Sequence, residues 1–489
     1  MRQKKLAQRA ASAALAACMM FTLSAPALAE STNALMQMSI NSRSSIARLN
    51  EENSIPASSL TLDLSDGSIE VFFDSDGKQY ARQNENPKQQ CDVLTVTSNN
   101  ESTSNTLDIQ GGTGTACVIL KDLRIEFLNG STKSPVSVKG NVDLYIEGVN
   151  DLTSNEGELK GAGIRKEDDG QLTIDGTGSL HVIGGGEAAG IGGNYNESGN
   201  NITINGGTIT AEGGLNGSGI GGGKYAGGSN IVVNGGEVTI IGGSGGDEYA
   251  PPAVVGSLKV NGGNVTLKKG NIGGEWVGTG EVDTSGLLVG SVTYKNNNGE
   301  VADHYKKQYG IYVNSIEVTS ENCTDILSNG ALSYDPATKT LSLNKSYTDA
   351  GSYMGTLTIN APKTTVNLNG GTYSVLQGKL VIEDAADVTL TSTAPKAIFG
   401  NVNITCAGKL SITCENLAVD GNLTVNNASS VELIGKNNNG GTVNGAAVFN
   451  NTGEVTIQNK DATKGAAHSI SYSGNYVYYT ADGGALTDP

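Results

Sequence analysis

The chain has 489 residues, a formal net charge of −17 and only 5% aromatic residues, while 68 of its residues are glycine. So acidic a surface repels nucleic acid and anionic lipid, and we therefore expect no nucleic-acid partner. The scarcity of aromatic residues is unsuited to a globular core and favours a repetitive β architecture.

Residues 1–29 have the features of a secretory signal peptide. Four basic residues precede an uncharged stretch that ends in Ala27-Leu28-Ala29, the small-residue pattern at which such peptides are cleaved. Cleavage after Ala29 takes the net charge from −17 to −21. A competing interpretation makes Cys18 the lipidated first residue of a lipoprotein. No later segment has the roughly 20 apolar residues of a spanning helix, so we expect a secreted or surface-held chain without a transmembrane segment.

Internal repeats are the most informative feature of the sequence. Segments of alternating apolar residues, each closed by Asp-Gly or Asn-Gly, recur 30, 29 and 27 residues apart and begin at Leu172, Ile202, Ile231 and Leu258. A second alternating strand follows each segment, and three repeats carry a glycine-rich third element near Gly161, Ala189 and Gly217. Two or three short strands per repeat predict the stacked coils of a parallel β-helix.

The alternation within each strand predicts which side chains face inward. Leu172, Ile202, Ile231 and Leu258 should form one interior column. The corner that follows carries Asp175, Asn205, Asn234 and Asn261, and stacked amides at such corners can hydrogen-bond between coils. An alternative remains, because Asn-Gly also marks a β-hairpin.

A second repeating region has a shorter period. Its strands recur at intervals of 22, 21 and 24 residues and begin at Leu380, Val402, Leu423 and Ala447. We expect an all-β chain made of two consecutive solenoids. The predicted segments are a signal peptide (1–29), a polar leader or N-terminal cap (30–58), a first β-helix (59–293), a linker (294–309), a second β-helix (310–460) and a C-terminal tail or cap (461–489).

The Gly-(Ala/Ser)-Gly-Ile-Gly-Gly element, alternating with Ile-Thr-Ile-Asn-Gly-Gly-Thr-Ile-Thr, resembles the carbohydrate-binding β-helix domains of secreted and surface proteins of gut Firmicutes. The resemblance covers about residues 60–460, and the segments 309–320 and 332–343 are similar to the lead-in of a second such unit. It implies a right-handed parallel β-helix and, from some relatives, calcium-dependent binding of plant-wall polysaccharides such as pectin. This chain has Ala162 and Ser218 where the aspartate-rich form of the motif has Asp, which weakens the implication of calcium.

Aromatic residues suggest a binding edge. Tyr195 stands four residues after Ile191, Tyr225 five after Ile220, and Trp276 four after Ile272, with Tyr249 just ahead of the coil at Val254. Coils separated by about 4.8 Å match one sugar unit, and aromatic faces suit the apolar faces of sugars. We therefore predict an aromatic ladder of Tyr195, Tyr225, Trp276 and Tyr249 for an extended glycan. The alternative is a set of unrelated loop aromatics.

Metal and disulfide signals are weaker. The candidate calcium ligands are the carboxylates of Asp168, Asp169, Asp247 and Glu248, since oxygen-rich turns can hold Ca²⁺, but no dedicated loop motif is present. The five cysteines after residue 29 do not form a disulfide framework. A Cys91–Cys117 or Cys406–Cys414 bridge stays open, Cys323 being the fifth thiol.

No catalytic constellation stands out. Polysaccharide-degrading β-helices need paired carboxylates, or calcium beside a basic residue, whereas the acid pairs here have no basic partner, and His181, His304 and His468 are isolated in the sequence. We expect a non-catalytic solenoid that binds an extended polysaccharide along one edge of its coils. The alternatives are a structural or adhesive stalk that binds host protein or mucin, and a β-helix polysaccharide lyase or hydrolase.

Overall fold

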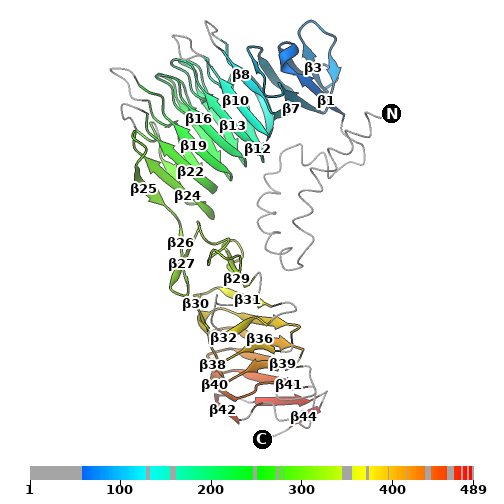
Figure 1. Cartoon of the computed structure of the whole chain (residues 1–489), viewed down its shortest axis with the longest axis vertical. Helices are drawn as coiled ribbons and strands as arrows, with labels where there is room; N and C mark the ends of the chain where they lie inside the picture. The colour runs from blue at the N-terminus through cyan, green and yellow to red at the C-terminus, as the bar shows by residue number, and fades with distance from the viewer. Residues whose placement is uncertain are drawn as a thin grey trace. The chain divides into compact units, whose positions relative to one another are not determined.

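The computed structural model describes residues 58–127, 133–154, 161–245, 251–270, 275–278, 280–343, 355–370, 374–394, 396–415, 417–435, 442–459, 467, 469–474, 477–481 and 484–486 (Figure 1). Residues 1–57, which contain the predicted signal peptide with Cys18 and most of the predicted leader, lie outside them. The chain divides between Lys307 and Gln308 into two compact units, called here the N-terminal unit and the C-terminal unit. Among the described residues, no helix has the length and apolar character to cross a membrane.

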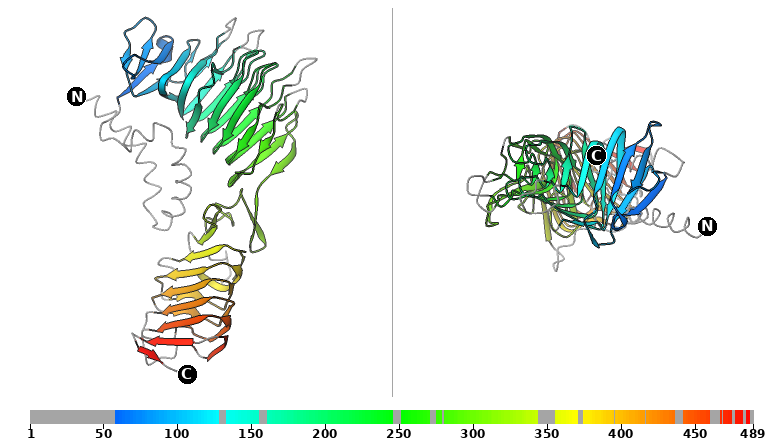
Figure 2. Two further views of the ribbon diagram at one scale, coloured as in Figure 1. Left: turned by 180° about the vertical axis from the view of Figure 1, so that it is seen from behind. Right: turned by 90° about the horizontal axis from the view of Figure 1, so that it is seen from above.

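Two sheets build the N-terminal unit, and their strands lie side by side as successive rungs (Figure 2). A single 3₁₀ turn, η1 (Leu64–Asp66), follows the first strand. Sheet 1 contains β1 (Ser59–Asp63), β2 (Ile69–Phe73), β3 (Gln79–Gln83), β4 (Gln89–Gln90), β5 (Val93–Thr97), β7 (Leu107–Lys121), β9 (Val136–Glu147), β11 (Ile164–Lys166), β12 (Leu172–Gly176), β14 (Ile191–Gly192), β15 (Gly199–Ile204), β17 (Ile220–Gly221), β18 (Gly228–Val233), β20 (Val254–Val255), β21 (Leu258–Val260) and β23 (Val282–Asp283). Sheet 2 contains β6 (Ser102–Thr103), β8 (Arg124–Glu126), β10 (Val149–Thr153), β13 (Ser179–Ile183), β16 (Thr208–Glu212), β19 (Glu237–Ile241), β22 (Gly262–Lys268), β24 (Val289–Lys295) and β25 (Val301–Tyr305).

The predicted interior column is confirmed. β12, β15, β18 and β21 pair in parallel, and the register places Leu172, Ile202, Ile231 and Leu258 opposite one another. All four side chains are fully buried, and each contributes roughly 1.5–3 kcal/mol of hydrophobic stabilisation. The fold is therefore the parallel, all-β solenoid that the repeats predict.

The asparagine corners stack as predicted. Nδ2 of Asn234 donates to Oδ1 of Asn205 at 2.8 Å, and Nδ2 of Asn261 donates to Oδ1 of Asn234 at 2.9 Å. In the first coil of the series Asp175 instead accepts from the N–H of Gly176. The β-hairpin alternative is wrong at these corners because every strand that follows one pairs in parallel with its counterpart in the next coil.

The glycine-rich third element forms the short strands β11, β14 and β17, and Ile164, Ile191 and Ile220 pair in parallel from coil to coil. Gly192 and Gly221 have φ values of +140° and +116°, which side-chain-bearing residues rarely adopt, and a Cβ on either would collide with a carbonyl oxygen of the next coil. The motif Ile-Gly is thus required because adjacent backbones approach closely at this position.

Lys166 interrupts the apolar interior of the N-terminal unit. It ends β11, where Ile164 points inward, Arg165 outward and Lys166 inward again. Only 2% of Lys166 is exposed, and its Nζ donates to the carbonyl oxygen of Gly170. Desolvation lowers the pKa of this amine below its ordinary value of 10.5.

Antiparallel strands flank the stacked coils of the N-terminal unit. β2 and β3 form a hairpin at its start. At its end β25 pairs antiparallel with β24, so part of the segment 294–309, expected to be a linker, is an ordered edge strand.

Two further sheets build the C-terminal unit. Sheet 3 contains β26 (Gln308–Val313), β27 (Ile316–Thr319), β30 (Gly355–Asn360), β32 (Leu376–Ala385), β34 (Lys396–Phe399), β35 (Val402–Cys406), β37 (Leu417–Asp420), β38 (Leu423–Asn426), β40 (Ala446–Thr452) and β42 (Ser469–Gly474). Sheet 4 contains β28 (Leu332–Asp335), β29 (Thr340–Leu343), β31 (Thr365–Asn369), β33 (Val388–Ser392), β36 (Lys409–Cys414), β39 (Ser430–Gly435), β41 (Glu454–Asn459), β43 (Val477–Ala481) and β44 (Gly484–Leu486).

The slimmer repeat also stacks in the predicted register. Leu380 faces Val402, Val402 faces Leu423, and Leu423 faces Ala447 in parallel pairs. The stack extends beyond residue 460, where a tail or cap was expected, because β42 and β43 pair in parallel with β40 and β41. An antiparallel strand, β44, then follows.

Candidate functional site

The corner that follows the third strand of each coil carries two of the predicted site residues. Ile191 pairs with Ile220 and Gly199 with Gly228, so positions 29 residues apart correspond across these two coils. Tyr195 therefore occupies the position of Lys224, and Asn196 that of Tyr225. The two tyrosines lie on adjacent coils but are offset by one residue, so their rings are not stacked in parallel.

Tyr195 and Tyr225 form an exposed aromatic pair. Their ring centroids are 6.0 Å apart and their planes are inclined at 75°, an edge-to-face arrangement. Tyr195 is 36% exposed and Tyr225 is 69% exposed. The pair presents a large apolar surface to solvent beside polar phenol groups, which is the combination that binds sugar rings.

Tyr225 is held in an unfavourable backbone conformation. Its φ is +67°, and the corresponding residue of the preceding coil, Asn196, has a φ of +60°. Asparagine tolerates this left-handed region, whereas a bulky residue there is a conformational outlier that costs about 1–2 kcal/mol. Strained backbone conformations of this kind are concentrated at functional sites. A tyrosine at this corner therefore lowers the stability of the fold relative to an asparagine.

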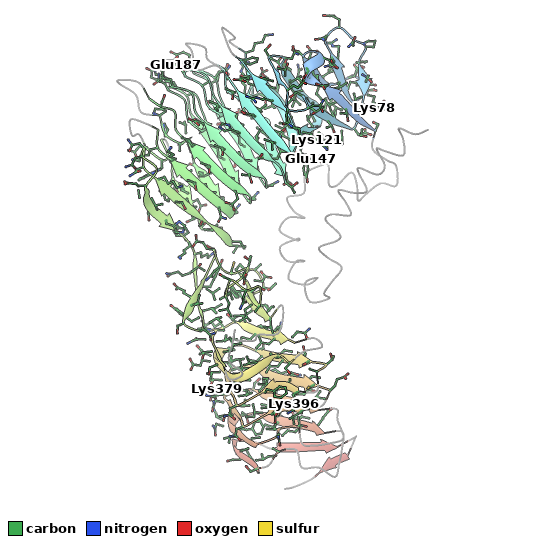
Figure 3. The ribbon with its side chains drawn as sticks, in the orientation of Figure 1. Lys78, Lys121, Glu147, Glu187, Lys379 and Lys396 are labelled. Atoms are coloured by element: carbon green, nitrogen blue, oxygen red, sulfur yellow. The ribbon has the colours of Figure 1, made fainter. Side chains whose placement is uncertain are left out.

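Ion pairs fix the charged side chains around the tyrosines. Nζ of Lys224 lies 3.0 Å from Oε1 of Glu187 and 5.0 Å from the ring centroid of Tyr225. The hydrogen bond to Glu187 raises the pKa of Lys224 above its ordinary value. Figure 3 places Glu187 at the opposite edge of the unit from the Lys121–Glu147 ion pair.

Arg165 forms a second set of ion pairs, with Glu167 on its own coil and with Glu197 on the next coil. Nε and Nη2 of Arg165 donate to the carboxylate of Glu197 at 2.9 and 2.7 Å, and Nη1 donates to Glu167 at 2.9 Å. The hydrogen bonds to Glu197 raise the pKa of Arg165. Every cation named at this corner is thus matched by a carboxylate, and the corner has no excess of positive charge.

Trp276 does not join the tyrosines. The third-strand residue of its coil is Val277, which bridges to Val254, so Trp276 precedes the third strand whereas Tyr195 and Tyr225 follow it. Its indole packs edge-to-face on Tyr294 at 5.5 Å and donates from Nε1 to the carbonyl oxygen of Lys295 at 2.8 Å. The expected ladder is therefore a pair within the described residues. Tyr249 and Ile272 lie outside them.

The candidate metal ligands serve as structural acceptors. Both carboxylate oxygens of Asp168 accept from the N–H of Gly140 at 2.9 Å, and Oδ1 also accepts from Gly170. Oδ1 of Asp169 accepts from Nδ2 of Asn200 at 2.7 Å. Among the described residues, no group of three or more potential ligands could hold a metal ion. Asp247 and Glu248 lie outside this part of the chain.

A column of polar side chains, four of them threonines, lies on the outer face of sheet 2 and was not predicted from the sequence; its strands β10, β13, β16, β19, β22, β24 and β25 are neighbours in Figure 1. The signal was the recurring apolar-Thr-apolar pattern of the second strand. Two histidines belong to the column, and each contacts a neighbouring member: Nδ1 of His181 lies 3.6 Å from Oδ1 of Asp151, and Nδ1 of His304 lies 2.8 Å from Oγ1 of Thr293. The column consists of Asp151, His181, Thr210, Thr239, Thr266, Thr293 and His304.

No protein-family model, no curated protein and no solved structure matches the chain.

Proposed function

We propose that this protein is a non-catalytic, carbohydrate-binding β-solenoid that is secreted or displayed at the cell surface. It binds an extended polysaccharide across the corner that carries Tyr195 and Tyr225. The observation that carries the proposal is Tyr225, a 69% exposed aromatic residue held at a φ of +67° where the neighbouring coil has asparagine. Backbone stability alone would favour asparagine at position 225. A tyrosine there is explained if its ring binds a sugar.

The charges at the corner favour a neutral polysaccharide. Arg165 is bound to Glu197 and Glu167, and Lys224 to Glu187. An acidic sugar polymer would have to displace these carboxylates, whereas a neutral chain lies on the tyrosine rings without breaking an ion pair. The net charge of −17 adds repulsion of acidic polymers at long range.

Calcium is not part of the proposed binding. The carboxylates of Asp168 and Asp169 already accept hydrogen bonds from backbone and asparagine N–H groups. We therefore expect binding to be insensitive to EDTA.

A glycan array and titration calorimetry on residues 30–489 test the proposal. We expect a neutral polysaccharide to bind, and the double variant Tyr195→Ala/Tyr225→Ala to weaken its affinity at least fivefold, since contact with an aromatic ring contributes about 0.5–1.5 kcal/mol per ring and the variant removes two rings. Tyr305→Ala is the matched control, because Tyr305 is a similarly exposed tyrosine of the same unit (39%) on β25.

Two results would contradict the proposal. Failure of the parent protein to bind any glycan would favour the adhesive stalk that engages protein or mucin. Release of new sugar ends from a bound polysaccharide would favour the lyase or hydrolase.

A further inference from the structure

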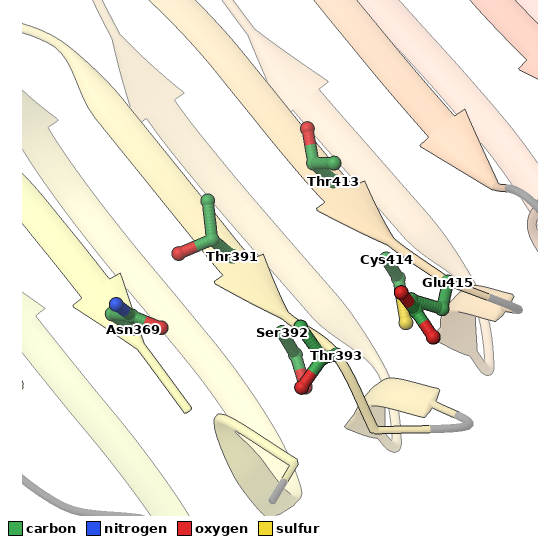
Figure 4. Close-up of a pocket in the computed structure, with 7 residues that line it drawn as sticks. All are labelled: Asn369, Thr391, Ser392, Thr393, Thr413, Cys414 and Glu415. Atoms are coloured by element: carbon green, nitrogen blue, oxygen red, sulfur yellow. The ribbon is translucent and has the colours of Figure 1, made fainter. Parts of the chain in front are cut away.

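The C-terminal unit contains a hollow that is independent of the tyrosine corner. It has a volume of about 260 Å³ and lies at the ends of three neighbouring strands of sheet 4, β31, β33 and β36 (Figure 4). Its lining consists of Asn369, Thr391, Ser392, Thr393, Thr413, Cys414 and Glu415.

The register explains why the hollow forms there. Asn369 pairs with Thr391, and Thr391 pairs with Thr413, so three short polar side chains follow one another on the outer face of consecutive coils. The next residue in the column is Ile434, a longer apolar side chain that ends the polar row. Short side chains beside a bulkier one leave space on an otherwise flat sheet.

The floor of the hollow is fixed by buried groups. Ser392 pairs with Cys414 across the two strands, and both side chains are buried. Oγ of Ser392 accepts from the N–H of Ala394 at 3.0 Å, and Sγ of Cys414 donates to the carbonyl oxygen of Ala394 at 3.1 Å. These hydrogen bonds hold Ala394, which follows β33, against β36 of the next coil. The hollow is therefore preorganised.

The lining chemistry selects the class of ligand. The amide of Asn369 and the hydroxyls of the threonines both donate and accept hydrogen bonds, the carboxylate of Glu415 accepts them, and the threonine methyl groups supply apolar contact. No Lys, Arg or His belongs to the lining, and the single formal charge, on Glu415, is negative. Anionic ligands are therefore disfavoured, and polyhydroxylated neutral ligands are favoured.

The volume restricts the size of the ligand. Pockets for drug-sized ligands start at about 300 Å³, and this hollow is slightly smaller. We infer that it binds one neutral pyranose residue, either free or at the end of a glycan chain. The site would give the protein a second mode of sugar recognition, end-on in the C-terminal unit, and it stands whether or not the tyrosine corner binds a polysaccharide.

Saturation-transfer NMR and titration calorimetry on residues 30–489 test the inference. The probes are the methyl pyranosides of glucose, galactose, mannose and N-acetylglucosamine, with methyl glucuronide as the acidic counterpart. We expect at least one neutral glycoside to bind, and the glucuronide to bind at least tenfold more weakly. The variants Thr413→Val and Glu415→Gln should each weaken binding of the neutral glycoside at least fivefold.

Matched variants separate this site from the tyrosine corner. Thr389→Val changes an outward-facing threonine of the neighbouring strand β33 that does not line the hollow, and it should leave the affinity within twofold, as should Tyr195→Ala/Tyr225→Ala. Valine has the shape of threonine and suits a strand, so circular dichroism should show unchanged β structure. The inference is overturned if no neutral pyranoside binds, if Thr413→Val and Glu415→Gln leave binding unchanged, or if the glucuronide binds equally well.

Discussion

Asn234 links three coils of the N-terminal unit through its side-chain amide, because it donates to Asn205 on one side and accepts from Asn261 on the other, at 2.8 and 2.9 Å. A partly buried amide that serves as both donor and acceptor ties the register of one coil to the next. The same side chain can be repeated at every coil, which is why this corner recurs in the sequence.

Replacement of Asn234 by alanine should destabilise the N-terminal unit. The change removes both hydrogen bonds, each with a net value of about 0.5–1.5 kcal/mol, so we expect the free energy of unfolding to fall by about 1–3 kcal/mol. Urea denaturation followed by circular dichroism measures the loss. Ser229→Ala, which removes one exposed hydrogen bond to Asn200, is the control and should cost less than half as much. Equal effects of the two variants would show that the amide stack adds nothing.

The stack and the interior columns were the parts of the fold that the sequence could predict. Leu172, Ile202 and Ile231 recur with the period of a coil and alternate with polar residues, so periodicity alone fixes their neighbours. The antiparallel edge strand β25 could not be predicted in the same way, because it does not repeat. Its pairing with β24 depends on a turn near Gly299, and the break in the pattern there resembled a linker.

The aromatic ladder could be predicted only in part, because the coil that carries Trp276 departs from the repeat. Trp276 was counted from Ile272, but the residue that bridges to the preceding coil is Val277. This error of five residues moves the indole to the other corner of the coil. Tyr195 and Tyr225 were predicted together because the coils they belong to have the same length. The conformation of Tyr225 depends on its position in the turn, and no composition or spacing reveals a positive φ for tyrosine.

The five cysteines after residue 29 should behave as buried thiols without a disulfide bond. Cys91, Cys117, Cys323, Cys406 and Cys414 are buried and unbridged, and burial raises the pKa values of Cys323 and Cys406 to about 11. Thiolates are the reactive form, so we expect negligible reaction with Ellman's reagent near pH 8 in the folded protein. In guanidinium chloride all five should react. A count of three would reveal a disulfide, Cys91–Cys117 or Cys406–Cys414.

Lys166 should make stability depend on alkaline pH. Because burial lowers its pKa below 10.5, the unfolded chain binds more protons than the folded chain between the lowered folded pKa and 10.5. The contribution of Lys166 to the free energy of unfolding therefore rises with pH across that window, and the full cost of burying the charge is present below it.

Lys166→Met tests this account, because methionine keeps an unbranched apolar chain without the charge. We expect the variant to be more stable than the parent near pH 7 by about 1–2 kcal/mol, as when other buried charges are replaced by apolar residues. The difference should shrink as the pH approaches 10.5. Denaturation at a series of pH values measures it, with the exposed Lys121→Met as control. A difference that stays constant with pH would contradict the assignment.

The most direct test of the proposed function is to give the Tyr225 corner the residue of the preceding coil. Tyr225→Asn relieves the cost of the left-handed conformation, about 1–2 kcal/mol, and loses the edge-to-face contact with Tyr195, about 0.5–1.5 kcal/mol. We therefore predict a free energy of unfolding within about 1 kcal/mol of the parent protein, together with about a two- to twelvefold loss of affinity for the polysaccharide that the parent binds, the loss that corresponds to about 0.5–1.5 kcal/mol for one ring. Unchanged affinity in a variant of equal or greater stability would contradict the claim that this tyrosine is retained to bind a glycan.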